Sequence, residues 1–215
     1  MARLRQIPVT IGLIAICVAL YLVTSNDPSL LDQYGDWGAG IQFLGQWYRL
    51  FTSIFLHVDF LHITLNMVSL LIIGRLVEPA FGKWRYLALF LVSGLGGSVV
   101  SYLIANPRTV AVGASGAIFG LFGAYFVLAR RAAASTSGIL ILIAINLFYS
   151  FSIPGISWQG HIGGLLTGLV LAAGFGLGRH RPNHVEVAAD VAVLVGCCIV
   201  LGLLMLLPAG AVHIG

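Results

Sequence analysis

Apolar stretches of membrane-spanning length alternate along the chain with short polar segments, and these segments hold most of the charged residues. Each stretch is interpreted as one helix. The predicted helices cover residues 8–23, 61–76, 86–104, 115–128, 138–151, 159–177 and 187–207. We therefore expect an all-α polytopic membrane protein, a single domain over residues 1–215 with its core at 8–178 and an additional helix at 187–207.

The composition supports this interpretation. Hydrophobic residues make up 59% of the 215 residues and charged residues only 8%, which excludes an ordinary soluble domain. The first stretch follows Arg3 and Arg5, as in a secretory signal, but it has no clear small-residue cleavage site, so we expect a retained helix. Cys17, Cys197 and Cys198 lie inside predicted spans and indicate neither disulfides nor a metal site.

Basic residues predict the orientation, because Lys and Arg beside a span resist translocation. With a cytoplasmic N-terminus, Arg49 and Arg108 would face the outside, nine other basic residues would face the inside, and the C-terminus would lie outside. The nine are Arg3, Arg5, Arg75, Lys83, Arg85, Arg130, Arg131, Arg179 and Arg181. The net charge of +4 is therefore a topology signal, and no basic cluster is dense enough to predict nucleic acid as a partner.

The longest connection, residues 24–60, is polar and carries the aromatic residues Trp37, Trp47 and Tyr48. A loop of this length with Trp and Tyr is typical of the membrane interface, where these rings suit the headgroup level. A simple tether is the alternative, and the sequence does not decide between the two.

Glycines recur at four-residue spacing in two of the predicted helices. Gly116 and Gly120 form one GxxxG motif, and Gly160, Gly164 and Gly168 form two overlapping ones. Small residues allow close helix contact in lipid, so we expect these two helices to cross each other. Packing alone would account for the glycines, but not for the polar residues beside them.

Three polar residues from different predicted helices lie at similar depth. Counting ~1.5 Å per residue from the basic helix ends across a ~30 Å hydrocarbon core places Ser115 roughly 8 Å and His161 roughly 3 Å below the outer surface. His62 lies about 10 Å below it if its helix ends at Arg75, and closer to it if the helix continues toward Glu78. Polar groups inside a membrane are costly, so their convergence needs an explanation.

Ser115 alone would be interpreted as a packing residue or a helix N-cap. With His161 at a matching depth, a Ser–His pair is the better hypothesis, because an imidazole can take the hydroxyl proton and return it to a leaving amine. Asp59 is the only carboxylate near these helix ends, and it belongs to a loop. We therefore expect a dyad whose imidazole is positioned by packing, with Phe119 stacked on the ring. Ser98 is a weaker rival nucleophile without a histidine at matched spacing.

The segment LHVDFLHITLNM contains three further polar residues, His57, His62 and Asn66. His62 and Asn66 are four residues apart and share a helix face, whereas His57 lies about 140° away from His62. A zinc site is the alternative, but the HExxH pattern is absent and an amide is a poor ligand, so no metal is expected. Donors from His62 and Asn66, with the backbone N–H of Ser115, fit a developing oxyanion better. We expect His57 to brace the loop by hydrogen bonds.

Five stretches together resemble the rhomboid family of intramembrane serine proteases. They are GQWYRLFTSIFLH, HVDFLHITLN, GRLVEPAFG, GASGAIFG and WQGHIGGLLTG, and they extend in family order from Gly45 to Gly168. The resemblance implies a rhomboid-like six-helix core in which Ser115 is the nucleophile and His161 the general base. The helix after residue 182 departs from this core and looks like the family's six-plus-one variety.

The resemblance also implies supporting roles. His62 and Asn66 would stabilise the oxyanion, and Gly113 would shape the turn that exposes the serine. The loop containing Tyr48 and Arg49 would lie partly in the membrane, and the segment SFSIPGIS with the fifth helix would gate substrate access. Some members carry Tyr at the stacking position, where this chain has Phe. The supporting residues expected at the site are Gly113, Gly116, Phe119, His57 and Gly164.

The sequence thus predicts a membrane-embedded serine endopeptidase that cleaves single-span proteins near the outer face, where small or helix-breaking residues let the substrate unwind. Its expected partners are these substrates and the lipid bilayer, with no nucleic acid and no cofactor. One alternative is a catalytically silent rhomboid-like protein that binds transmembrane clients. Another is a transporter that uses His62 and His161 as a proton path. No transit peptide is visible, so we expect a prokaryotic plasma (inner) membrane.

Overall fold

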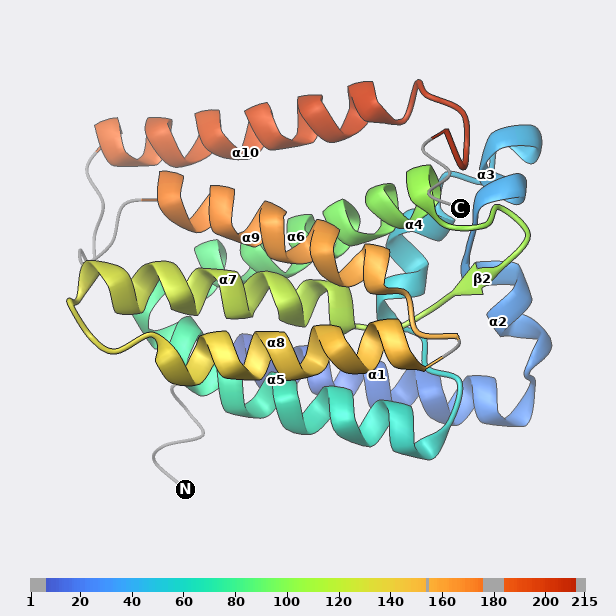
Figure 1. Cartoon of the computed structure of the whole chain (residues 1–215), viewed down its shortest axis with the longest axis horizontal. Coiled ribbons are helices and arrows are strands. Elements are labelled where there is room, and N and C mark those ends of the chain that lie inside the picture. The colour runs from blue at the N-terminus through green and yellow to red at the C-terminus, as the bar shows by residue number, and fades with distance from the viewer. Residues whose placement is uncertain (1–6, 154, 176–183, 212–215) are drawn as a thin grey trace.

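The computed structural model describes residues 7–153, 155–175 and 184–211, and these form one bundle of helices (Figure 1). Seven helices of 16 to 22 residues dominate the described part of the chain. They are α1 (Pro8–Asn26), α5 (Phe60–Phe81), α6 (Lys83–Ile104), α7 (Ser115–Arg131), α8 (Ser137–Ser152), α9 (Trp158–Gly174) and α10 (His184–Leu204). The predicted all-α class is confirmed, with one addition. Strands β1 (Asp36–Trp37) and β2 (Val110–Ala111) form a short antiparallel pair.

Each predicted span coincides with one of these helices, with differences at the ends. The largest is at α5, which continues past Arg75 to Phe81 because Val77, Glu78 and Phe81 are buried against its neighbours. α9 ends at Gly174, before the predicted limit at 177, and residues 176 and 177 lie outside the described residues. By length and composition, α1, α5, α6 and α10 can cross a membrane, and α8 is a shorter apolar helix.

Helices α6, α7 and α9 form the centre of the bundle and pack against one another most extensively. Their contact depends on glycine, because a Cβ atom on Gly164 would overlap the carbonyl oxygen of Gly116, and one on Gly168 that of Gly120. The predicted crossing of the two glycine-rich helices is therefore confirmed. α1 and α5 lie on one side of this centre and α10 on the other, while α8 lies at the edge beside α7 and α9 (Figure 1).

A buried carboxylate joins α1 to α5, the helix that carries His62 and Asn66. Glu78 of α5 accepts hydrogen bonds from the backbone N–H groups of Val9 and Thr10 and from the Thr10 hydroxyl, at 2.7–3.0 Å. The first N–H groups of a helix have no partner within the helix, so this carboxylate supplies the hydrogen-bond acceptors for the N–H groups at the start of α1. The arrangement fixes the position of α5 in the bundle.

The connection between α1 and α5 is a folded unit, and its interpretation as a simple tether is wrong. It contains α2 (Ser29–Tyr34), β1, α3 (Gly38–Leu44), α4 (Arg49–Thr52) and the 3₁₀ helix η2 (Ser53–Phe55). Arg49 is 4% exposed and holds the unit together from inside. Its guanidinium donates to the carbonyl oxygens of Asp32 and Gly35 at 2.6 and 3.0 Å and to the Gln46 side chain at 2.6 Å.

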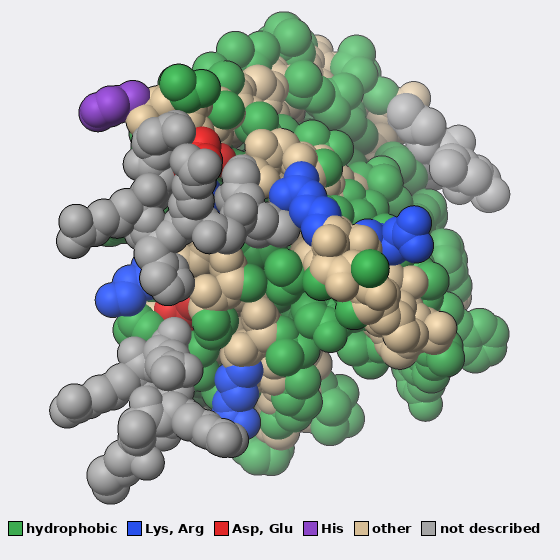
Figure 2. Space-filling view, turned by 90° about the vertical axis from the view of Figure 1, so that its left-hand side faces the viewer, with side chains coloured by type: hydrophobic (Ala, Val, Ile, Leu, Met, Phe, Trp, Pro, Cys, Tyr) green, Lys and Arg blue, Asp and Glu red, His purple; other side chains and the backbone are tan. Residues whose placement is uncertain are grey.

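Five of the described basic residues, all on the long helices α5, α6 and α7, gather at one end of the bundle, which we call the arginine end. It holds Arg75, Lys83, Arg85, Arg130 and Arg131. Figure 2 shows Lys and Arg side chains on this face, with apolar side chains around it. Four residues used to predict the orientation, Arg3, Arg5, Arg179 and Arg181, lie outside the described residues. The opposite end, where α7 and α9 begin, is the Ser115 end.

The last helix is attached to the rest of the bundle at both ends. Near the arginine end, Arg85 of α6 forms an ion pair of 2.7 Å with Asp190 of α10. At the other end, the Tyr102 hydroxyl donates to the carbonyl oxygen of Leu207, and the N–H of Ala209 donates to the Gln42 side chain. The segment after α10 therefore contacts both α6 and the folded unit before α5.

Candidate active site

Ser115 is the first residue of α7 and follows a tight turn. Gly113 adopts φ +135°, a conformation that favours glycine, and its N–H donates to the carbonyl oxygen of Ser53 at 2.9 Å. Ala114 occupies the N-cap position, and no side chain caps the helix there. The N-cap interpretation of Ser115 is therefore wrong, and its hydroxyl is available for another partner.

That partner is His161, in the first turn of α9. The Ser115 Oγ atom lies 2.8 Å from Nε2 of His161. His161 is only 7% exposed. The two helices come this close because Gly116 of α7 faces Gly164 of α9 without intervening side chains. The glycine pattern and the polar pair thus belong to one helix contact.

Phe119 covers one face of the imidazole. Its ring centroid lies 4.3 Å from that of His161, and the ring planes differ by only 10°. Phe119 is 3% exposed and packs edge-on against Phe122, with ring centroids 5.5 Å apart. The imidazole therefore cannot tilt toward α7 without displacing a buried ring.

A hydrogen bond also positions the His161 ring. The expectation that packing alone positions the imidazole is therefore wrong. The Oγ atom of Ser150, on α8, lies 2.6 Å from Nδ1 of His161. Asp59, the carboxylate considered from the sequence, instead caps α5 by accepting the His62 N–H at 2.7 Å. Sequence reasoning missed Ser150, although a signal existed. Ser150 is one turn after Asn146 and eleven residues after Ile139, which places all three on one face of α8.

His62 and Asn66 lie on α5, facing the turn before α7. A Cβ atom on Gly113 would lie 2.9 Å from Nε2 of His62 and 3.7 Å from Ser115 Oγ, so this nitrogen faces the serine turn. The Nδ1 atom of His62 is buried without a hydrogen-bond partner. In the tautomer with its proton on Nε2, the ring would present a hydrogen-bond donor to the serine turn. The Asn66 side-chain NH₂ donates to the carbonyl oxygen of His62 at 2.9 Å, and within the described residues its second N–H has no partner.

That His57 braces the loop by hydrogen bonds stays a prediction. The residue is 1% exposed, and neither ring nitrogen forms a hydrogen bond of good geometry within the described residues. Its ring centroid lies 5.1 Å from that of His62, with the planes tilted by 60°. The His57 ring therefore packs against the ring of His62.

A polar cavity of about 40 Å³ adjoins Ser115. Its walls include five further polar residues, Asp36, Ser53, Ser98, Ser101 and Ser157. A water molecule needs roughly 10–15 Å³ and two to four polar partners, so the cavity can hold water. Ser98, the rival nucleophile, approaches Ser53 Oγ at 3.5 Å and has no histidine contact among the described residues. Burial raises the pKa of the Asp36 carboxyl to about 8, although the Arg49 charge partly opposes the shift.

Comparison with known proteins matches residues 44–178 to the Rhomboid domain. The rhomboid protease GluP of Bacillus subtilis is 41% identical over 138 residues, which are 62% of this chain and 27% of GluP. A second protein of that organism, YdcA, is 33% identical over 177 residues, 79% of this chain and 89% of YdcA. The rhomboid protease AarA of Providencia stuartii is 28% identical over 214 residues, 83% of this chain and 76% of AarA.

The chain thus spans about a quarter of GluP and most of YdcA and AarA. The matched domain contains all of α5, α6, α7, α8 and α9, and with them the two residues of the Ser–His contact. It also covers more than half of the 215 residues. The resemblance found in the sequence is therefore confirmed, and the chain belongs to the rhomboid family.

Proposed function

We propose that the chain is an intramembrane serine endopeptidase with Ser115 as nucleophile and His161 as general base. The single observation that carries the proposal is the 2.8 Å hydrogen bond between Ser115 Oγ and His161 Nε2. Polar groups are costly inside a membrane helix bundle, and helix packing does not require that a hydroxyl and an imidazole meet. A protein that only binds transmembrane clients has no need of this bond.

In the proposed reaction, Ser115 Oγ attacks the scissile carbonyl carbon while Nε2 of His161 takes the hydroxyl proton. Breakage of the C–N bond leaves an acyl-enzyme, and His161 returns the proton to the leaving amine. Water then attacks the ester, with His161 again acting as base, and Ser115 is regenerated. The polar cavity of about 40 Å³ beside Ser115 supports this last step, because it offers room for the water inside the bundle.

The oxyanion that forms during attack needs donors in place before the reaction. We assign this role to the Nε2–H of His62, the free N–H of the Asn66 side chain and the backbone N–H of Ser115. The His62 ring faces the serine turn, which supports the assignment. The start of α7 adds the partial positive charge of a helix N-terminus.

In the six-plus-one arrangement that we propose, α1, α5, α6, α7, α8 and α9 form the core and α10 is the additional helix. The 16 and 17 residues of α7, α8 and α9 extend about 24–26 Å, which thinning of the bilayer accommodates. The arginine end would face the cytoplasm with the N-terminus, and the Ser115 end would face outside, in a prokaryotic plasma membrane. The Lys and Arg side chains at the arginine end (Figure 2) support this orientation.

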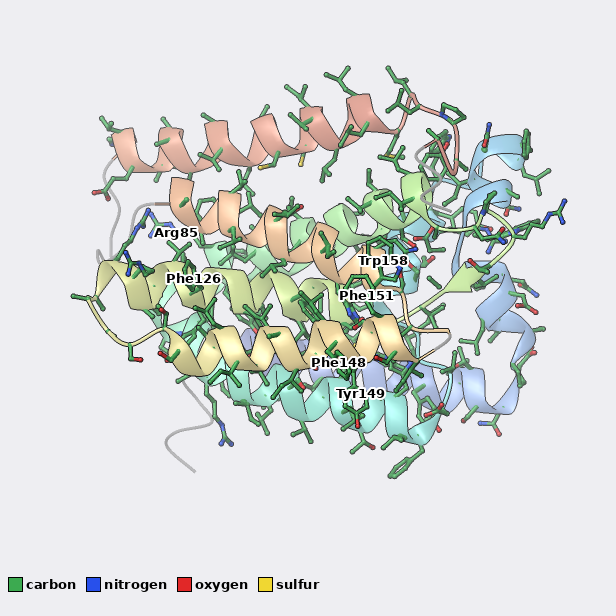
Figure 3. All side chains as sticks on the ribbon, viewed as in Figure 1. Arg85, Phe126, Phe148, Tyr149, Phe151 and Trp158 are labelled. Atoms are coloured by element: carbon green, nitrogen blue, oxygen red, sulfur yellow. The ribbon has the colours of Figure 1, made fainter. Side chains whose placement is uncertain are left out.

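The substrates in this proposal are single-span membrane proteins, cleaved near the outer face. A helical substrate hides its scissile carbonyl in hydrogen bonds, so segments with small or helix-breaking residues would unwind into the site. Access would open between α8 and its neighbours, because α8 lies at the edge of the bundle. Where α8 and α9 meet, Phe151 and Trp158 form a ring contact of 4.9 Å that would close this path (Figure 3). Residue 154 of the gating segment lies outside the described residues.

Labelling with a fluorophosphonate tests the proposal, because this probe reacts only with an activated serine. The detergent-solubilised wild type should be labelled and should cleave members of a panel of single-span substrates. Ser115→Ala and His161→Ala should abolish both activities. Ser98→Ala is the matched control, because Ser98 lines the same cavity without a histidine partner, and it should be labelled normally. An unlabelled wild type, or labelling that persists in Ser115→Ala, would contradict the proposal.

A further inference from the structure

Ser150 is a buried polar residue on a helix that is otherwise largely exposed. It is 3% exposed, while its neighbours Phe148, Tyr149 and Phe151 are 57–71% exposed. Figure 3 shows these aromatic residues at the end of α8 that lies beside the start of α9. With Ile139 and Ile143, Ser150 belongs to the buried face of α8. Its hydroxyl therefore points into the bundle, toward His161.

The hydrogen bonds of Ser150 decide where the proton of His161 lies. The Oγ atom is 2.6 Å from the carbonyl oxygen of Asn146 and 2.6 Å from Nδ1 of His161. A carbonyl oxygen can only accept, so the single hydroxyl proton of Ser150 is donated to Asn146. The contact with His161 then forms only if Nδ1–H donates to Oγ. The lone pair of the neutral ring is consequently on Nε2, facing Ser115.

We propose that Ser150 is a positioning residue that holds His161 in the tautomer able to accept the Ser115 proton. The inference rests on the proposed function and deepens it. The opposite tautomer would place a proton on Nε2 and leave the Ser115 hydroxyl without a base. After His161 has taken the proton, Nδ1–H still donates to Ser150 Oγ, so the contact persists through the reaction.

The location of Ser150 connects the reaction to the position of α8. Ser115 and His161 belong to α7 and α9, the helices that glycine contacts lock together, whereas Ser150 belongs to the edge helix. The hydrogen bond to Nδ1 forms only while the face of α8 with Ile139 and Ile143 is packed against the bundle. A substrate that displaces α8 would therefore release His161 until α8 returns.

The test compares Ser150→Ala with the matched control Ser152→Ala. Ser152 lies two residues further along α8 and makes the same type of bond, donating to the carbonyl oxygen of Phe148 at 2.7 Å, but its side chain is exposed. Ser150→Ala should lower kcat about 10-fold or more with KM unchanged, and Ser152→Ala should keep the wild-type kcat. Ser150→Thr, which keeps a hydroxyl able to bond back to Asn146, should recover activity.

A second measurement separates positioning from a general loss of structure. The ¹⁵N spectrum of His161, recorded at mildly alkaline pH, should show the proton on Nδ1 in the wild type and in Ser152→Ala. In Ser150→Ala it should show a mixture of both tautomers. The inference would be overturned if His161 of the wild type carried its proton on Nε2, or if Ser150→Ala and Ser152→Ala had equal kcat.

The two proposals fail in different ways. The tautomer of His161 is measured without substrate, so it does not depend on protease activity. A wild type with the proton on Nδ1 but no fluorophosphonate labelling would refute the protease and leave the Ser150 geometry standing. A labelled, active wild type with the proton on Nε2 would refute the role of Ser150 alone.

Discussion

The ring of Phe119 lies almost parallel to the imidazole of His161, 4.3 Å away and within 10°. Together with Ser150 on the ring edge, this contact leaves the imidazole one orientation, in which Nε2 faces Ser115. A stacked pair of this kind contributes about 0.5–1.5 kcal/mol beyond the area it buries. Phe119 therefore acts on the orientation of the base and takes no part in the proton transfer.

Replacement of Phe119 by leucine should lower kcat about 2- to 10-fold, because the stacking energy is lost while an apolar side chain still fills most of the space. The matched control is Phe122→Leu, since Phe122 is equally buried and contacts Phe119 but is not stacked on His161. Both variants should lose similar thermal stability. Equal kcat in the two variants would show that stacking does not orient the base.

The contacts predicted from the sequence are those that local spacing defines. Glycines recur at four-residue intervals in two helices, which marks one face of each helix whatever the rest of the chain does. They are Gly116 and Gly120 in one helix, and Gly160, Gly164 and Gly168 in the other. The same crossing brings Ser115 Oγ to 2.8 Å from His161 Nε2, a pair that the matching depth of the two residues predicts. The expectation for Phe119 followed in the same way, because it lies one turn after Ser115.

Other features depend on how elements that are distant in the sequence pack against each other. The spacing of residues within one element does not show this packing. Ser150 is a serine among aromatic residues in an apolar helix, and its role appears only when α8 packs beside α9. Arg49 holds the folded unit before α5 through carbonyl oxygens of Asp32 and Gly35, and backbone acceptors carry no sequence signature. The sequence therefore does not show whether this unit is an interface element or a tether.

The turn before Ser115 should not tolerate a side chain at Gly113. Its φ of +135° strains any L residue, and a Cβ atom would lie 2.9 Å from Nε2 of His62, in the space proposed for the oxyanion. Gly113→Ala should therefore reduce kcat about 10²-fold, as the loss of an oxyanion donor does. Gly138→Ala, in the first turn of α8 with open space around it, is the control. Unchanged turnover in Gly113→Ala would mean that the oxyanion does not form at this turn.

The crossing of α7 and α9 should control the Ser–His distance. A methyl group at Gly164 would overlap the carbonyl oxygen of Gly116, so Gly164→Ala must push the two helices apart. Fluorophosphonate labelling should fall strongly, together with thermal stability, because Ser115 Oγ and His161 Nε2 separate. Gly202→Ala, in α10 with nothing near the added atom, should change neither property. Full labelling of Gly164→Ala would mean that the dyad forms without close helix contact.

Asp36 should make stability depend on pH in the direction opposite to most carboxylates. Burial raises its pKa to about 8 in the folded protein, against an ordinary value of 3.8 that applies when the chain unfolds. Between these values the folded state binds the extra proton, so the free energy of unfolding falls as pH rises from about 4 to about 8. The slope contributed by one such group is at most about 1.4 kcal/mol per pH unit.

Asp36→Asn should remove this slope, because the amide is a neutral stand-in for the protonated carboxyl at every pH. Thermal unfolding of the detergent-solubilised protein across the range from pH 5 to pH 8 measures the effect. The variant should gain stability relative to the wild type as pH rises. Asp32→Asn is the control, since its side chain is exposed on α2, and it should follow the wild-type curve. Parallel curves for Asp36→Asn and the wild type would instead mean that Asp36 is ionised in the folded protein, with its charge held by Arg49.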